Sequence, residues 1–142
     1  MDRRSAWAGL VAWTGELVDD TDSDVVNAEE YEGRWAVRVR QQVRDFTTVW
    51  FEVGDLTVGF EAYVLPNPPR GHESVYRQLM IRNHRMWRSH FSVDADGDIH
   101  LVGRVPLSEW SPDTLDAVLG AIYEGVELSF RSLVETGFRK GS

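Results

Sequence analysis

The 142-residue sequence contains no cysteine. It can therefore form no disulfide, offers no thiolate nucleophile and cannot bind zinc through sulfur. Long hydrophobic runs are also missing, since no apolar stretch approaches the roughly 20 residues that a membrane-spanning helix requires. The apolar stretch after Ser5 is interrupted by Thr14 and Glu16, too early for a signal peptide, so we expect a cytoplasmic protein that does not enter a membrane.

Basic residues are scarce, and the formal net charge is −8. This acidity argues against nucleic-acid binding, which draws most of its affinity from neutralising phosphates. The charge is unevenly distributed: the segment 19–32 has seven acidic residues and no basic one, whereas the segment 70–90 has five arginines and one glutamate. The two segments are either ordinary solvated surfaces or regions that attract each other or a second copy of the chain.

The motifs of catalysis and metal binding are absent as well. Calcium loops counted from Asp20 or Asp94 lack the required glycine and the bidentate glutamate. The four histidines do not form a ligand set, and no serine elbow or glycine-rich phosphate loop is present. Glu52 and Glu61 could form a carboxylate pair, but cross-strand pairing with arginines is the commoner role. We therefore predict no catalytic residue, no cofactor and no metal.

Alternating apolar residues predict strands over 34–40, 47–53 and 56–65. We expect a two-residue turn at Gly54-Asp55, which pairs Val53 with Leu56 and Trp50 with Gly59.

A second hairpin is expected over 91–105. Asp94 to Gly97 has the residues of a type I turn followed by a residue with positive φ, which predicts a three-residue loop with Asp94 opposite Asp98. This register places five apolar residues on one face: Phe91, Val93, Ile99, Leu101 and Val105.

Helical periodicity predicts helices over 5–18, 73–87 and 112–135, and the acidic segment 19–33 is expected to be a loop. In the second helix the expected buried stripe is Tyr76, Leu79, Met80, Asn83 and Trp87.

The last helix contains Gly120 and Gly125, which we expect to mark close approach of a strand or another helix. Gly137 is expected to end the helix in the left-handed conformation. The resulting order, α-β-β-β-α-β-β-α, predicts a single α+β domain over 1–142 with its core in 5–138. It has a five-stranded antiparallel sheet with helices largely on one face.

Exposed aromatic residues are the feature that points toward function. Trp50, Tyr63 and Val102 fall on the outward face of the predicted sheet, and Trp13 and Trp110 lie outside the predicted core. Aromatic side chains with interspersed arginines are typical of protein interfaces. The candidate partner-binding residues are Trp50, Tyr63, Val102, Arg38, Gly120 and Gly125.

The sequence resembles the YbjN family, described as sensory transduction regulators with a fold similar to type III secretion chaperones. The resemblance rests on TTVWFEVGD at 47–55, on Tyr76-Arg77-Gln78-Leu79, on Arg82-Asn83, and on 91–103 followed by the helix after Pro106. It implies a small, non-enzymatic, dimeric module that binds a protein client or regulates a process. The dimer would form through the outward face of the predicted sheet, which the helices leave free, or through the last helix with its two glycines.

Two rival functions remain open. One is a small-molecule binder or enzyme that uses a cleft between sheet and helices. The other is nucleic-acid binding through Arg77, Arg82, Arg85 and Arg88, which the net charge disfavours.

Overall fold

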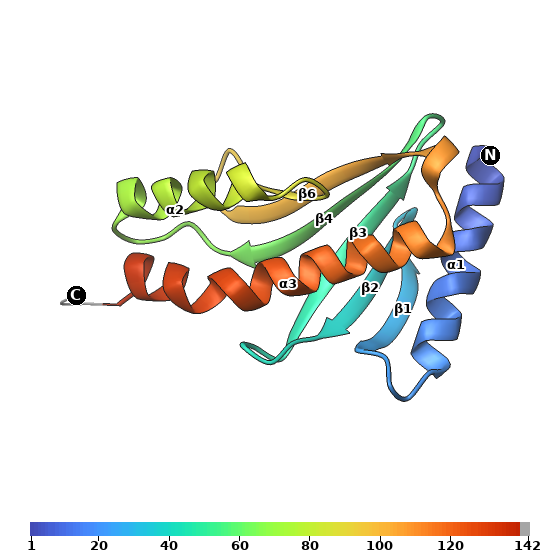
Figure 1. Cartoon of the computed structure of the whole chain (residues 1–142), viewed down its shortest axis with the longest axis horizontal. Helices are drawn as coiled ribbons and strands as arrows, with labels where there is room; N and C mark the ends of the chain where they lie inside the picture. The colour runs from blue at the N-terminus through green and yellow to red at the C-terminus, as the bar shows by residue number, and fades with distance from the viewer. Residues whose placement is uncertain (140–142) are drawn as a thin grey trace.

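The computed structural model describes residues 1–139. Over these residues the chain forms one antiparallel sheet, in the order β1-β2-β3-β4-β6-β5, and Figure 1 shows the helices gathered on one side of it. The strands are β1 (Val25–Tyr31), β2 (Arg34–Arg40), β3 (Phe46–Val53), β4 (Thr57–Leu65), β5 (His90–Val93) and β6 (Ile99–Pro106). The helices are α1 (Arg3–Asp19), α2 (His72–Arg85), the short 3₁₀ turn η1 (Leu107–Glu109) and α3 (Pro112–Gly137). The predicted α+β class with an antiparallel sheet is confirmed.

The sheet has six strands, so the predicted count of five is wrong. The additional strand is β1, which lies within the segment 19–33 that we expected to be a loop, and it pairs with β2 at one edge of the sheet. Tyr31 faces Arg34 across a two-residue turn whose residues, Glu32 and Gly33, both have positive φ. An edge strand exposes much of its surface, so its acidic residues are tolerated and the apolar alternation that identifies strands is weak.

The β3–β4 hairpin is displaced from the predicted register. Val53 pairs with Val58 instead of Leu56, and Trp50 pairs with Glu61 instead of Gly59. The turn residues are Asp55 and Leu56, because the Gly54 amide donates to the Thr57 carbonyl at 2.8 Å. A shift of two residues preserves the parity of a strand, so the side chains of β3 and β4 keep the faces we predicted for them. Leu56, expected to point inward, instead lies in the turn and is exposed.

The β5–β6 hairpin has the predicted register. Val93 pairs with Ile99, and the Asp94 amide donates to the Asp98 carbonyl at 3.0 Å. Gly97 has a φ of +87°, as the three-residue loop requires.

The side of the sheet that faces the helices forms the core. Trp110, expected outside it, is only 3% exposed and packs against Phe51 and Trp13, at 6.1 and 6.0 Å between ring centroids. Its indole nitrogen donates to the Ala6 carbonyl at 3.3 Å. Trp13 and Trp110 therefore lie on the core side, and the expectation that they add to the outward aromatic surface is wrong.

Helix α2 buries only part of the predicted stripe: Leu79 is buried and Tyr76 packs against the core. Val75 and Leu79 are buried, whereas Met80 is exposed and Trp87 lies beyond the end of the helix with 77% of its surface exposed. The helix is short and covers only one edge of the sheet, so two residues suffice to anchor it and apolar side chains outside that stripe remain uncovered.

The glycines of α3 have different surroundings. A side chain at Gly125 would lie 2.9 Å from Leu101 of β6, which confirms a close approach there, whereas Gly120 has no neighbouring atom within 4 Å, so that prediction is wrong. Gly137 remains helical and packs against Pro68, so it does not form the predicted left-handed cap.

Glu127 of α3 fixes the connection between β2 and β3. Its Oε2 accepts hydrogen bonds from the Gln41 side chain at 2.7 Å and from the amides of Gln42 and Val43 at 3.0 and 3.2 Å. Burial raises the pKa of this carboxyl group, but the three hydrogen bonds outweigh burial and the pKa is lowered.

Candidate functional site

The sheet side that faces away from the helices carries four of the six predicted partner-binding residues. Trp50, Glu61 and Val102 form one row across β3, β4 and β6, because Trp50 pairs with Glu61 and Glu61 with Val102. Tyr63 lies on the next outward position of β4, and Arg38 on β2 faces the same way. We call this surface, defined by Arg38, Trp50, Glu61, Tyr63 and Val102, the open sheet face.

Trp50 lies at the centre of the open sheet face. The Arg34 guanidinium lies 4.5 Å from the centre of its ring, and the ring of Tyr31 packs edge-on at 6.0 Å. Arg34 also forms the expected ion pair with Glu61, at 3.4 Å. Beside Trp50 lies a shallow hollow of about 350 Å³, which extends across Gly59 to Val102. An aromatic platform beside a hollow, with charges of both signs around it, is suited to receive a side chain of another protein.

Tyr63 marks a second aromatic position on this face and is 44% exposed. Its ring packs edge-on against His100 at 5.5 Å, and His100 Nε2 donates to Asp94 Oδ2 at 2.7 Å. Partial burial, together with the nearby charges of Asp98 and Asp94, raises the pKa of Tyr63. The hydrogen bond from His100 lowers the pKa of Asp94. His100 is thus held in place by a carboxylate, and within residues 1–139 no three acidic or histidine side chains gather as a metal site would need.

Gly120 and Gly125 are not part of the open sheet face. Both lie on α3, on the opposite side of the sheet, and Gly125 is covered by Leu101 and Met86. The structure therefore separates these two glycines from the other four candidates.

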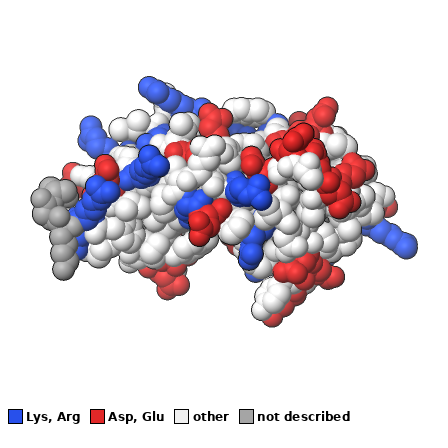
Figure 2. All heavy atoms as spheres, turned by 90° about the horizontal axis from the view of Figure 1, so that it is seen from below, with Lys and Arg blue, Asp and Glu red and all other residues white. Residues whose placement is uncertain are grey.

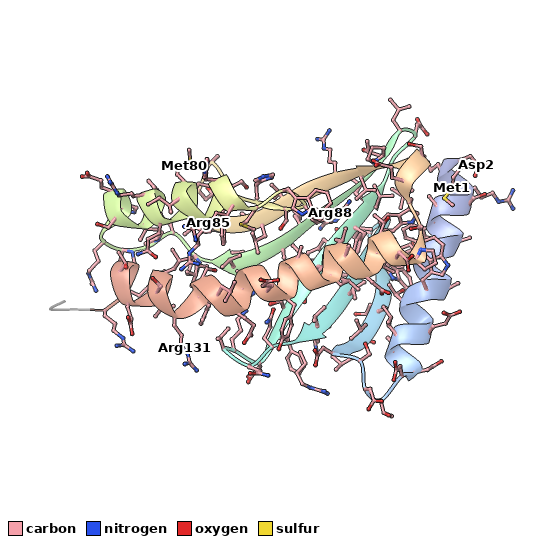
Figure 3. The ribbon with its side chains drawn as sticks, in the orientation of Figure 1. Met1, Asp2, Met80, Arg85, Arg88 and Arg131 are labelled. Carbon is pink, nitrogen blue, oxygen red and sulfur yellow. The ribbon has the colours of Figure 1, made fainter. Side chains whose placement is uncertain are left out.

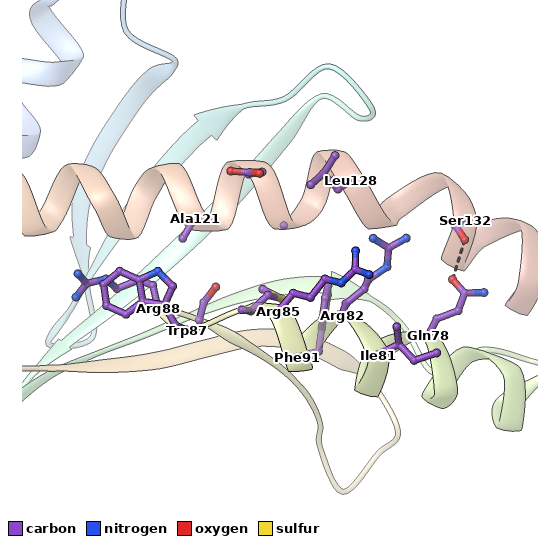
Figure 4. A pocket seen from close by; sticks show the side chains of 14 residues that line it. Gln78, Ile81, Arg82, Arg85, Trp87, Arg88, Phe91, Ala121, Leu128 and Ser132 are labelled. Carbon is purple, nitrogen blue, oxygen red and sulfur yellow. Dashed lines mark hydrogen bonds between the residues drawn. The ribbon is translucent and has the colours of Figure 1, made fainter.

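Sequence reasoning missed a groove between α2 and α3. It has a volume of about 700 Å³ and its walls include Ile81, Arg85, Trp87 and Leu128 (Figure 4). Its trace in the sequence is Ile81 and Met86, two apolar residues that lie off the predicted stripe of the second helix.

The fold and the open sheet face define the class: a small α+β domain with helices on one face of an antiparallel sheet and the other face exposed. The chain belongs to the YbjN family, whose model, described as "Putative bacterial sensory transduction regulator", matches residues 13–135. No helix within residues 1–139 combines the length and apolar character needed to cross a membrane.

Relatives occur in mycobacteria. The chain is 40% identical to "Uncharacterized protein ML2442" of Mycobacterium leprae over 106 residues, which are 75% of this chain and 58% of that protein. It is 42% identical to "Uncharacterized protein Rv0487" of Mycobacterium tuberculosis over 87 residues, 61% of this chain and 48% of that protein. The chain thus spans about half the length of the curated relatives it matches.

A solved structure shares the fold. A chain of the heterodimeric complex ExoU-SpcU, from the type III secretion system of Pseudomonas aeruginosa, matches with a TM-score of 0.52 and 16% sequence identity. The match covers 89% of this chain and 96% of that chain. At this identity the likeness shows the fold alone, and it agrees with the fold that the family resemblance implied.

Proposed function

We propose that this chain is a non-enzymatic module that binds another protein through the open sheet face, in a chaperone-like or regulatory role. The observation that carries the proposal is the row from Trp50 to Val102, which crosses the centre of the sheet on the side that no helix covers. Family membership supports a regulatory role, and the shared fold with a chain of a heterodimeric complex supports a protein partner.

The composition of the open sheet face supports binding to a protein. Tryptophan, tyrosine and arginine are the residues that most often dominate binding energy at protein interfaces. Two cation–π contacts place positive charge on aromatic surface: the Arg34 guanidinium lies 4.5 Å from the centre of the Trp50 ring, and the Arg38 guanidinium lies 5.4 Å from that of Phe46. Such rigid, amphipathic platforms lose little conformational freedom when a partner covers them.

The same face is suited to pair with a second copy. Arg38 and Arg104 alternate on it with Glu52 and Glu61, and a two-fold axis places a surface against itself. Mixed charges allow opposite signs to meet in such a pairing. We therefore propose a homodimer that forms through the open sheet face. We do not propose one through α3, because Gly120 and Gly125 lie on the other side of the sheet and Gly125 is covered by Leu101 and Met86.

Sedimentation tests this proposal. We expect Trp50→Glu to lower the mass in solution from that of a dimer to that of a monomer and to abolish binding to protein partners identified by cross-linking. Leu56→Glu is the matched control, because Leu56 is exposed at the tip of the β3–β4 turn. A Trp50→Glu protein of unchanged mass that keeps its partners refutes the proposal.

The second candidate is a small-molecule binder that uses the groove between α2 and α3. Its volume of about 700 Å³ lies within the range of small-ligand sites. This small-molecule function would be favoured if the protein bound a small molecule saturably and Trp50→Glu changed neither the mass in solution nor the binding to protein partners.

A further inference from the structure

The groove between α2 and α3 lies on the helical side of the sheet, away from the open sheet face. Its long wall runs on α3 from Ala121 to Ser132, about 16 Å or three helical turns. Figure 4 shows Arg82 and Arg85 reaching from α2 into the space between the helices. One end is closed by a hydrogen bond from Ser132 Oγ to Gln78 Oε1 at 2.7 Å.

The walls of the groove include large apolar side chains that are exposed over the described residues. Trp87 is 77% exposed, Leu128 on the facing helix is 63% exposed, and Ile81 on α2 is 56% exposed. Three large apolar side chains converging on one concavity are unusual on the surface of a protein that has no partner.

The charge in the groove is strongly positive for a protein of net charge −8. Arg82, Arg85 and Arg88 line it against one acidic residue, Glu124. Within residues 1–139 none of these arginines forms an ion pair with a carboxylate. The Arg88 guanidinium instead lies over the Trp87 ring, 4.3 Å from its centre.

Two buried polar atoms at the same place also lack partners. Arg88 Nε and Ser89 Oγ are buried, and over the described residues neither has a hydrogen-bond partner, although both residues line the groove. Buried polar groups are normally paired, so these two atoms are exceptions beside the groove.

We infer that this groove binds an acidic amphipathic helix of a partner protein. Leucine-like side chains of that helix fill the space between Ile81, Trp87 and Leu128, and its Asp and Glu residues pair with the arginines. A three-turn groove matches the usual spacing of anchors at positions i, i+3, i+4 and i+7. The inference concerns a second surface and does not depend on the function of the open sheet face.

Other occupants fit the observations less well. If a second copy paired groove to groove, the arginines of one groove would face the arginines of the other, and like charges repel. The acidic segment of a second copy lies by β1, at the opposite edge of the sheet from β5, and Figure 2 shows acidic side chains gathered at the end that holds α1 and β1. That contact runs head to tail, and a head-to-tail contact gives a closed ring or an open filament instead of a two-fold dimer. An anionic membrane presents a broad surface that does not enter a concave site.

The test uses the full chain and three fluorescein-labelled 14-residue peptides. The peptides share leucines at helical i, i+3, i+4, i+7 spacing and carry Glu, Lys or Gln at all other positions. We expect the Glu peptide to bind at least tenfold more tightly than the Lys and Gln peptides in fluorescence polarisation, despite the negative net charge of the protein. Equal binding of the three peptides, or none, overturns the inference.

Two double variants locate the site. Arg85→Glu with Leu128→Ser changes the groove, whereas Arg131→Glu with Met80→Ser makes equivalent changes on the same two helices at side chains that point away from it (Figure 3). All four positions are exposed, so both variants are expected to fold. We expect the first to weaken Glu-peptide binding at least tenfold and the second to change it less than twofold.

Several results contradict the inference. Equal weakening by both double variants means that the peptide responds to overall charge. If the wild type binds phosphatidylcholine–phosphatidylglycerol vesicles and only the groove variant loses this binding, the groove binds a membrane. If the wild type forms filaments in sedimentation and only the groove variant loses them, the groove binds a second copy.

Discussion

Asn83 of α2 makes the hydrogen bonds with the outer edge of β5 that a further strand would make. Its Nδ2 donates to the Phe91 carbonyl at 3.1 Å, and the Phe91 amide donates to its Oδ1 at 2.7 Å. β5 is an edge strand, and unpaired edges of this kind are open to unwanted strand pairing. Asn83 therefore both anchors α2 to the sheet and protects the edge.

Replacing Asn83 with alanine removes both hydrogen bonds. Each contributes about 0.5–1.5 kcal/mol net, so the free energy of unfolding should fall by about 1–3 kcal/mol. With a urea m-value of about 2 kcal/mol/M, the midpoint of urea unfolding should fall by about 0.5–1.5 M. Asn83→Asp, which keeps an acceptor for the Phe91 amide but loses the donor, should also destabilise the protein.

Hydrogen exchange at a single amide tests the reasoning directly. The Phe91 amide should exchange faster in Asn83→Ala than in the wild type, whereas the amides between β3 and β4 should change only as far as global stability requires. A Phe91 amide that stays equally protected, with an unchanged urea midpoint, would show that the two hydrogen bonds contribute nothing.

Two further predictions concern packing and pH. Gly103→Ala should lower the free energy of unfolding by about 1–3 kcal/mol, because its Cβ would overlap the ring of Phe60 and lie 2.7 Å from the Arg88 carbonyl oxygen. Gly120→Ala, in open helical surface, should instead stabilise by up to about 1 kcal/mol; urea unfolding of both variants checks the sign. Because hydrogen bonds lower the pKa of Glu127, its contribution is present above the ordinary carboxyl pKa and is lost as pH falls through the folded value. Glu127→Gln should therefore flatten the loss of stability with acid, and an unchanged pH profile would contradict this.

The sequence alone determined what depends on short-range rules. Turn residues and parity fixed the β5–β6 register and the faces of β3 and β4, so Trp50, Tyr63, Val102 and Arg38 were correctly placed on one surface. Parity survives a two-residue error in register, which is why the face was right although the partner of Trp50 was not.

Tertiary structure decided what depends on which neighbours cover a residue. β1 exists because β2 offers it an edge, and its acidic side chains hid it from any pattern of alternation. Trp110 is buried because α1 and β3 meet over it, whereas Trp87 is exposed because α2 ends at Arg85, before it reaches this position. The α2–α3 groove could be seen only once the two helices were packed side by side, since burial depends on the whole arrangement and not on the residues nearby in sequence.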